Sequence, residues 1–173
     1  MAQGKIVVFE GIDQAGKATQ TERLAALLEA RGYATLRLAF PAYETPIGRE
    51  IGAFLSGGVE IPLHVRHLLY AANRYEFKAQ IERSVAEGTI VLIDRYSASG
   101  IVYGMAHGLP RGWLEALEAE LPAPDFVFFL DLSPETARRR KRTARDRYER
   151  NLPLLATCRR LYREECERSA GWI

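Results

Sequence analysis

The 173-residue sequence contains only two cysteines, Cys158 and Cys166, and no long uninterrupted apolar run. Two cysteines near the end of the chain are too few for a disulfide framework or a zinc site, so we expect small core or surface residues of one helix. No apolar run approaches the length of a membrane-spanning helix, and the N-terminus lacks a signal-peptide pattern. These absences predict a reduced, cytoplasmic protein that does not associate with membranes.

An excess of charge of one sign is also absent. The 24 basic and 22 acidic residues leave a formal net charge of +2, so no global field attracts nucleic acid to the chain. Hydrophobic residues make up 47% of the sequence and charged residues 27%, which fits one globular domain over residues 1–173. No repeat or low-complexity linker divides it.

Short apolar runs alternate with helical patterns along the chain. The runs cover residues 6–10, 35–40, 89–94 and 126–132, and the helical patterns cover 17–31, 63–87, 113–121 and 145–168. Nearly continuous apolar strands are typical of a sheet that is covered on both faces. The alternation therefore predicts an α/β fold, in which a parallel β-sheet core is flanked by helices and joined by right-handed crossovers.

Local signals place some element ends. Ser133-Pro134-Glu135 combines a capping residue, a proline at the first helical position and an acid in the first turn, which predicts a helix start. Gly32 and Gly88 are expected to end helices just before strands. The last three residues, 171–173, resemble the opening of another strand, so we expect the native chain to continue past Ile173.

The first strand runs into a phosphate-binding pattern, G-x-x-x-x-G-K, at residues 11–17. A glycine-rich turn between a buried strand and a helix aims backbone N–H groups at one point, and the helix N-terminus adds partial positive charge there. The alternative, a glycine-bearing turn with a chance lysine, does not explain the position in the first strand–helix unit. The residues expected around the phosphates are Gly11, Ile12, Asp13, Gln14, Ala15, Gly16, Lys17, Ala18 and Thr19.

One position departs from the phosphate-loop pattern. The hydroxyl residue that normally follows the lysine and binds Mg²⁺ is replaced by Ala18, and Thr19 comes one residue late, about 100° around the helix. Because Mg²⁺ keeps several waters and binds substrate phosphates, we expect weakened metal binding in a site that still works.

A second group of candidate residues follows the strand at 89–94. Asp94 ends this strand, where an open parallel sheet places its ligand crevice, and its carboxylate can hold Mg²⁺ through water. The neighbouring Arg95 can bind a phosphate bidentately. The alternative is a structural Asp94–Arg95 pair that caps the strand. Since the phosphate loop lies at the same edge of the predicted sheet, we favour the functional interpretation.

Five ordered motifs resemble thymidylate kinase, a P-loop nucleoside monophosphate kinase: FEGIDQAGK, Phe40-Pro41, LLYAANRYE at 68–76, DRYSAS at 94–99 and DRYE at 146–149. The resemblance implies a P-loop kinase fold and transfer of the γ-phosphoryl group of ATP to dTMP. It also implies Mg²⁺ and a homodimer. By position it assigns a dTMP pocket to Asp13 (deoxyribose 3′-hydroxyl), Phe40, Tyr70 (stacking on thymine), Arg74 (base or phosphate), Arg95 (acceptor phosphate), Ser99 and Tyr103.

Three of these assignments have ordinary structural alternatives. Tyr70 and Tyr103 are also explained by core packing, and Arg74, in the middle of a helix, by a surface ion pair. Two further positions depart from the family, because Ala39 and Tyr43 stand where members often carry arginines. These losses put tight binding of dTMP in question.

Residues 138–150, RRRKRTARDRYER, hold eight basic residues and form the arginine-rich segment of the chain. A solvated helix face and a nucleic-acid patch are two interpretations. The third, which we favour, is a lid that closes arginines over the transferring phosphoryl group. In the resembling family an arginine lies either in the phosphate loop or in the lid. Here the loop position is Gln14, so Arg142 or Arg145 would supply the charge, and Arg140 aligns with the arginine that packs on adenine.

Three rivals to a thymidylate kinase follow from the same residues. A deoxynucleoside kinase would need a carboxylate base for the sugar hydroxyl, for which Glu10 is available. A nucleotide-binding homologue with impaired catalysis is suggested by Ala18, Ala39 and Tyr43. A nucleic-acid binder would use the arginine-rich segment, with binding that weakens as salt rises.

Overall fold

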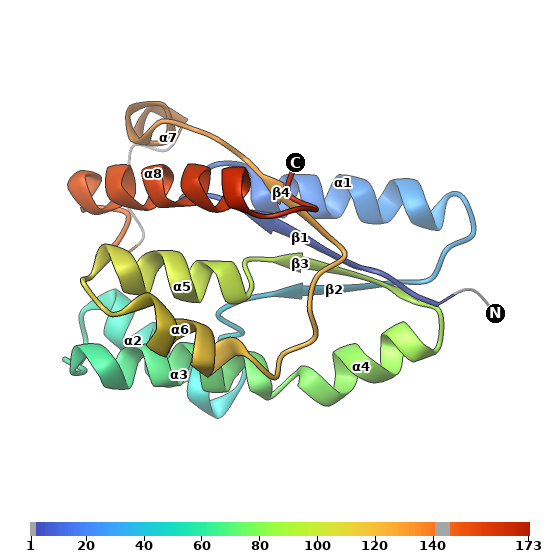
Figure 1. Cartoon of the computed structure of the whole chain (residues 1–173), viewed down its shortest axis with the longest axis horizontal. Coiled ribbons are helices and arrows are strands. Elements are labelled where there is room, and N and C mark those ends of the chain that lie inside the picture. Colours follow the sequence, from blue (N-terminus) through green and yellow to red (C-terminus); the bar gives the residue numbers. More distant parts are fainter. Residues whose placement is uncertain (1–2, 141–145) are drawn as a thin grey trace.

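The computed structural model describes residues 3–140 and 146–173. Its centre is a parallel sheet of four strands in the order β2-β3-β1-β4, drawn in Figure 1. The strands are β1 (Ile6–Glu10), β2 (Thr35–Ala39), β3 (Ile90–Asp94) and β4 (Phe126–Phe129). All four predicted strands are therefore confirmed, with the fourth shorter than expected.

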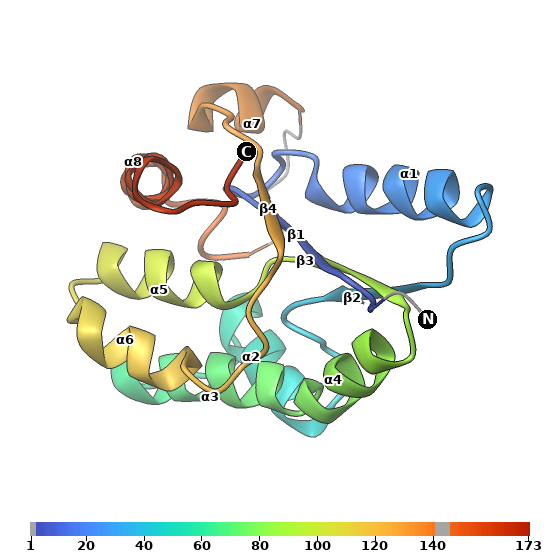
Figure 2. The same ribbon diagram turned by 45° about the vertical axis from the view of Figure 1, so that its right-hand side comes forward.

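Eight helices of the described residues surround the sheet, as Figures 1 and 2 show. They are α1 (Lys17–Glu29), α2 (Pro46–Ser56), α3 (Leu63–Tyr75), α4 (Lys78–Ala86), α5 (Ser97–Ala106), α6 (Arg111–Glu118), α7 (Pro134–Arg140) and α8 (Leu152–Arg168). None of these helices combines the length and the apolar character that crossing a membrane requires.

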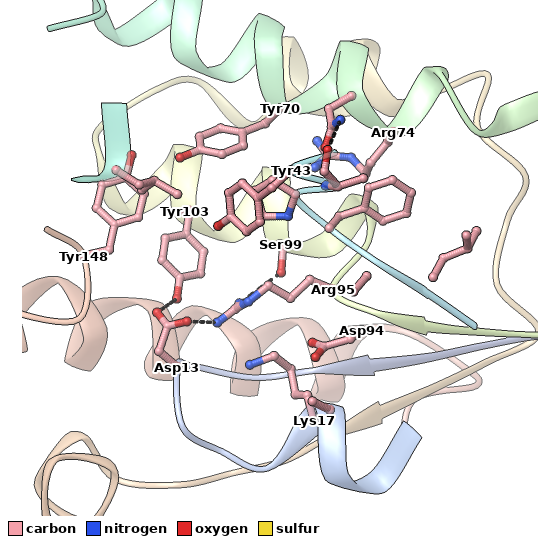
Figure 3. Close-up of a pocket in the computed structure, with 18 of the residues that line it drawn as sticks. Asp13, Lys17, Tyr43, Tyr70, Arg74, Asp94, Arg95, Ser99, Tyr103 and Tyr148 are labelled. Atoms are coloured by element: carbon pink, nitrogen blue, oxygen red, sulfur yellow. Dashed lines mark hydrogen bonds and ion pairs between the residues drawn. The ribbon is translucent and has the colours of Figure 1, made fainter. Parts of the chain in front are cut away.

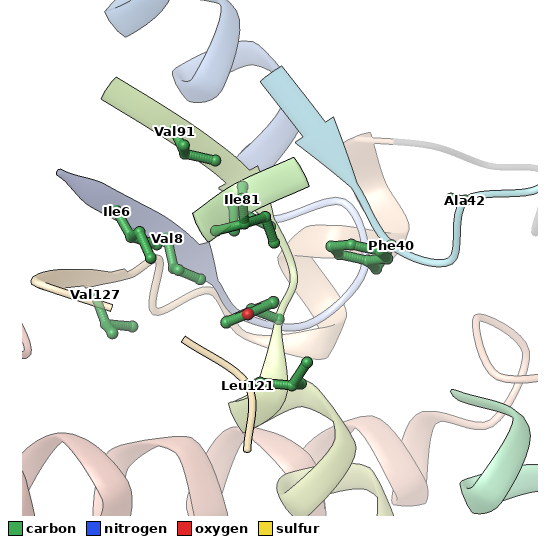
Figure 4. Close-up of a cluster of buried hydrophobic side chains, with 10 residues drawn as sticks. Ile6, Val8, Phe40, Ala42, Ile81, Val91, Leu121 and Val127 are labelled. Atoms are coloured by element: carbon green, nitrogen blue, oxygen red, sulfur yellow. The ribbon is translucent and has the colours of Figure 1, made fainter. Parts of the chain in front are cut away.

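The inner strand β1 is buried along its whole length because helices cover both faces of the sheet. Its alternate residues point to opposite sides. Val7 and Phe9 pack with residues of α1, whereas Ile6 and Val8 join a cluster that includes Ile81 of α4 and is shown in Figure 4. This explains why the strand is apolar at consecutive positions rather than at alternate ones.

The predicted helices differ from the observed ones in number and in bounds. Residues 63–87 form two helices, α3 and α4, instead of the single one expected. The last helix begins at Leu152 rather than near 145, and α2 and α5 were not foreseen. The predicted start at Ser133 is confirmed, because its hydroxyl oxygen accepts a hydrogen bond from the Thr136 N–H at 3.2 Å.

The last residues lie beside the sheet, as expected for a strand opening. Trp172 forms an isolated parallel bridge with Val127 of β4, and the N–H of Ile173 donates to the Val127 carbonyl at 2.9 Å. The two cysteines lie on α8, with Cys158 buried and Cys166 partly exposed.

Candidate active site

The phosphate loop connects β1 to α1 through two glycines in unusual conformations. Gly11 has φ 139°, and a Cβ there would lie 2.7 Å from the Leu130 carbonyl oxygen, so the loop passes too close to the residue after β4 for a side chain. Gly16 caps α1 with φ 104°, a left-handed conformation that favours glycine. The two glycines bring the helix N-terminus to the end of β1, which creates an anion-binding position.

Lys17 is buried at the first position of α1. Its Nζ donates to the Ile12 carbonyl at 2.8 Å, and among the described residues it forms no ion pair with a carboxylate. Burial, together with the charge of Arg95, lowers the pKa of Lys17 to about 8, although Asp13 and Asp94 partly offset this effect. The ammonium group is therefore held at the loop by a carbonyl oxygen and not by a described carboxylate, as expected for a group that binds phosphate.

Arg95, Asp13 and Tyr103 form a linked group at the centre of the pocket (Figure 3). One Arg95 nitrogen, Nη2, donates to Asp13 at 2.6 Å, while Nη1 donates to Ser99 Oγ at 3.3 Å. The Tyr103 hydroxyl donates to the other Asp13 oxygen at 3.2 Å. This group joins the phosphate loop to the residues that follow β3, which the sequence placed at the same edge of the sheet.

The charges of the group stabilise one another. Burial alone would raise the pKa of Asp13, but the positive charges of Arg95 and Lys17 outweigh burial and hold this pKa below its ordinary value. Burial would lower the pKa of Arg95, yet Asp13 and other neighbours raise it well above its ordinary value. These shifts favour the ionised form of Asp13 and the cationic form of Arg95.

The structure corrects the alternative in which Asp94 and Arg95 pair with each other. Arg95 pairs with Asp13, whereas the Asp94 side chain lines the pocket and forms no ion pair within the described part of the chain. Arg95 has φ 65°, an uncommon conformation for a residue with a side chain, and its N–H donates to the Phe9 carbonyl at 3.0 Å. Because of this backbone turn, the consecutive side chains of Asp94 and Arg95 both reach the pocket.

Glu10 is buried and does not line the pocket. Its carboxylate is fully buried and accepts hydrogen bonds from the Tyr96 N–H at 2.9 Å, the Ser99 hydroxyl at 2.7 Å and the Tyr162 hydroxyl at 2.9 Å. Burial raises the pKa of Glu10, although these donors oppose the effect. Glu10 therefore connects β1 to α5 and α8 and supports Ser99, and it is not placed to act as a base on a bound ligand.

Aromatic side chains form the end of the pocket that lies away from the phosphate loop. The pocket has a volume of about 780 Å³, and the predicted residues Phe40, Tyr70, Arg74, Ser99 and Tyr103 all line it. Tyr103 stacks on Tyr148 with ring centroids 5.8 Å apart. The alternative of core packing is partly right for Tyr103, which is buried while it also lines the cavity, and for Tyr70, which packs against a core cluster of α2 while it lines the cavity. The surface ion pair expected as the alternative for Arg74 is wrong, because Arg74 is 3% exposed.

Most, but not all, residues of the predicted phosphate loop line the pocket. Asp13, Gln14, Gly16 and Lys17 do, together with Ala18 and Thr19. The Ile12 side chain instead packs in a core cluster with α8, and Gly11 and Ala15 are buried outside the lining. A phosphate loop binds its ligand mainly through backbone N–H groups, so it does not need every side chain to face the pocket.

The arginine-rich segment meets the phosphate loop at both of its described ends. Arg140 Nη1 donates to the carbonyl oxygens of Gln14 at 3.4 Å and Ala15 at 3.3 Å, and the Gln14 amide donates to Glu149 at 2.8 Å. Arg142 and Arg145, the predicted catalytic arginines, lie outside the described residues.

Several pocket residues received no site role from the sequence. Asn73 lines the pocket and holds the segment after β2, since its side-chain oxygen accepts from the Ala42 N–H at 2.8 Å. Asp146, Tyr148 and Glu149 line it as well. These three belong to the DRYE motif, so the motif itself was the available signal for them.

Comparison with known proteins gives a consistent result. The sequence profile of the family described as thymidylate kinase matches residues 9–173. The thymidylate kinase of Arabidopsis thaliana is 41% identical over 148 residues, which cover 86% of this chain and 56% of that protein. The thymidylate kinase of Dictyostelium discoideum is 35% identical, with 94% of this chain and 73% of that protein covered.

A solved structure extends the similarity to three dimensions. The thymidylate kinase from Candida albicans superposes with a TM-score of 0.88 at 29% sequence identity, covering all of this chain and 83% of that one. The shared architecture includes the edge of the sheet where the pocket lies.

Proposed function

Because the chain belongs to the thymidylate kinase family, we propose that it transfers the γ-phosphoryl group of ATP to dTMP and releases dTDP. The observation that carries the proposal is that a single pocket holds Lys17 and the phosphate loop at one end and aromatic side chains at the other. Arg95 lies between them (Figure 3), where a donor phosphate and an acceptor phosphate would meet.

In this proposal the groups that line the pocket have separate parts in the reaction. The loop amides and Lys17 bind the phosphates of ATP, and Arg95 holds the acceptor phosphate with its planar guanidinium group. Asp13 orients Arg95 and accepts a hydrogen bond from the deoxyribose, while Tyr70 stacks on the base. No general base is needed, because a phosphate monoester is already a nucleophile. Catalysis therefore rests on positioning and on electrostatic stabilisation.

A magnesium ion bound to ATP fits the donor set of the pocket. Within residues 3–140 and 146–173, no cluster of three or more His, Cys, Asp or Glu residues is able to hold a metal ion alone. Mg²⁺ in kinases is usually held by one or two carboxylates together with substrate phosphates and waters. Asp94, which lines the pocket and pairs with no described cation, supplies one such carboxylate. The bound ion would neutralise charge on the phosphates of ATP.

The rate of phosphorylation of several acceptors tests the proposal. We expect dTMP to be phosphorylated with a kcat/KM at least about 100-fold above that of thymidine, because only dTMP engages the charged Arg95. The fully bonded Glu10 leaves a deoxynucleoside kinase without the base that this alternative assigned to it. Faster turnover of thymidine would overturn the proposal, and binding of ATP and dTMP without formation of dTDP would favour an impaired homologue.

Restoring a hydroxyl group at the position after Lys17 is expected to strengthen the binding of Mg²⁺. Ala18 is exposed and lines the pocket, so a serine side chain fits there without displacing a neighbour. We expect Ala18→Ser to lower the Mg²⁺ concentration for half-maximal rate by about tenfold, the effect of one hydrogen bond to a charged group. A titration of Mg²⁺ at saturating ATP and dTMP measures this, with Ala119→Ser as the control. An unchanged midpoint would mean that the metal does not use this position.

We also propose that two copies of the chain form a homodimer. The exposed apolar residues Val65 and Leu68 are three positions apart on α3 and therefore share one face of that helix. Beside them, His64 of α3 packs on Trp113 of α6 with ring centroids 5.3 Å apart. An apolar helix face of this kind supports an interface between two copies of the chain.

A further inference from the structure

A buried ion pair connects the wall of the pocket to a helix outside it. Arg74 of α3 lines the pocket and is 3% exposed, while Glu118 ends α6, does not line the pocket and is 8% exposed. Arg74 Nε donates to Glu118 Oε2 at 2.9 Å, and Arg74 Nη2 donates to Glu118 Oε1. Both carboxylate oxygens and two of the three guanidinium nitrogens are therefore used in one bidentate pair.

The pair leaves one end of the guanidinium group available. In the described part of the chain, Arg74 Nη1 has no hydrogen-bond partner, so its two N–H groups can meet a ligand in the pocket. Arg74 and Tyr70 both come from α3 and both line the pocket (Figure 3). Because a guanidinium group only donates, it suits a carbonyl oxygen on the edge of a pyrimidine and not an amino group.

We propose that Glu118 is a positioning residue, which fixes Arg74 so that Nη1 reads the carbonyl oxygen of the acceptor base. The proposal rests on the proposed function, since it takes a pyrimidine nucleoside monophosphate as the ligand. An arginine side chain has many rotamers, and the bidentate pair removes that freedom before the ligand binds. Glu118 thus acts on the substrate only through Arg74.

A glycine on a third helix provides the room for this pair. A Cβ at Gly100 of α5 would lie 2.5 Å from Glu118 Oε1 and 2.6 Å from Arg74 Nη2. Gly100 has no positive φ, so it is the close approach of the pair, not the backbone conformation, that excludes a side chain. Residues of α3, α5 and α6 together hold the guanidinium group in place.

Replacing Glu118 with glutamine tests the proposal, because one acceptor oxygen becomes a donor that faces a donor. We expect the KM for dTMP to rise by at least about tenfold and the preference for dTMP over dCMP to shrink by a similar factor. The KM for ATP and the kcat at saturating dTMP should stay within about twofold, since neither depends on reading the base. Glu115→Gln, on the exposed side of the same helix, is the matched control.

A second variant keeps both charges and displaces the pair. Gly100→Ala should reproduce the rise in the KM for dTMP and the loss of preference over dCMP. Gly112→Ala, where an added Cβ meets no atom within 4 Å, should change neither. This variant also decides the question if Glu118→Gln does not yield folded protein.

A double-mutant cycle separates positioning from a general loss of structure. In an Arg74→Gln background, Glu118→Gln should alter the KM for dTMP by less than about twofold, because no guanidinium group remains to be held. An equal effect in both backgrounds, or an unchanged preference for dTMP in Glu118→Gln and Gly100→Ala, would overturn the proposal. Equilibrium binding of dTMP and dCMP to the same variants tests the role of Glu118 even if the protein does not form dTDP. Failure of the proposed function is therefore distinguished from failure of this inference.

Discussion

Replacing Lys17 with alanine is expected to lower kcat by about 10²–10³-fold, the effect of removing one preorganised group that stabilises charge in a transition state. Lys17 is the first residue of α1, and among the described residues that line the pocket it alone carries an ammonium group. Since its Nζ donates only to the Ile12 carbonyl, its removal breaks no ion pair in the described structure. The loss should therefore appear in turnover and not in folding.

The initial rate of dTDP formation and the melting temperature together measure this effect. Lys78→Ala is a suitable control, because Lys78 lies on α4 outside the pocket and pairs with Glu82. We expect the control to keep the wild-type rate and both variants to melt near the wild type. A fall in kcat of less than about tenfold for Lys17→Ala would mean that the transferring phosphoryl group lies elsewhere.

The same lysine should make the binding of ATP depend on pH. Because the pKa of Lys17 is lowered to about 8, the free protein carries the charged form below this pH and loses it above. Phosphates attract only the charged form, so the affinity for ATP should fall as the pH rises through about 8. Titrations of ATP from pH 6.5 to pH 9.5 measure the change. In Lys17→Arg, whose charge does not titrate in this range, affinity should stay constant.

The sequence was sufficient for the sheet and the phosphate loop because their signals are local. Each strand is recognisable as a short apolar run. Residues 11–17 have the fixed spacing of a phosphate loop and lie between a strand and a helix. The helix α2 was missed because Gly48 and Gly52 interrupt its pattern, although Thr45 and Pro46 carry a clear start signal. The break between α3 and α4 was missed because residues 76–77 contain neither glycine nor proline.

The supporting contacts of the site were not predictable in the same way. Arg74 and Glu118 are 44 residues apart, and Glu10 and Tyr162 are 152 residues apart, so neither pair leaves a pattern of spacing. Motifs placed Arg95 in the pocket but could not choose Asp13 over the adjacent Asp94 as its partner, because that choice depends on the left-handed backbone of Arg95. Many of the side chains that line the pocket are thus readable from motifs, while the contacts that hold them in place depend on the fold.

Replacing Arg95 with methionine is expected to lower kcat/KM for dTMP by about 10²–10³-fold, which is the range for truncating one member of a buried charge pair. The guanidinium group of Arg95 pairs with Asp13, and its planar donors suit the phosphate of the acceptor. The KM for ATP should change by less than about threefold, because Lys17 and the loop amides remain. Initial rates over a range of dTMP concentrations measure the first effect, and equilibrium titration with ATP measures the second.

The methionine variant also leaves Asp13 without its cation, so two causes of the loss must be separated. If the unpaired Asp13 repels the acceptor phosphate, the double variant Arg95→Met/Asp13→Asn should recover most of kcat/KM for dTMP. If Arg95 binds the phosphate itself, the double variant should stay within about fivefold of Arg95→Met, since the lost donors are not replaced. We expect the second result, because Asp13 occupies Nη2 while Nη1 holds only a longer bond of 3.3 Å to Ser99. Recovery in the double variant would assign Arg95 to neutralising Asp13 and leave the acceptor phosphate to another group.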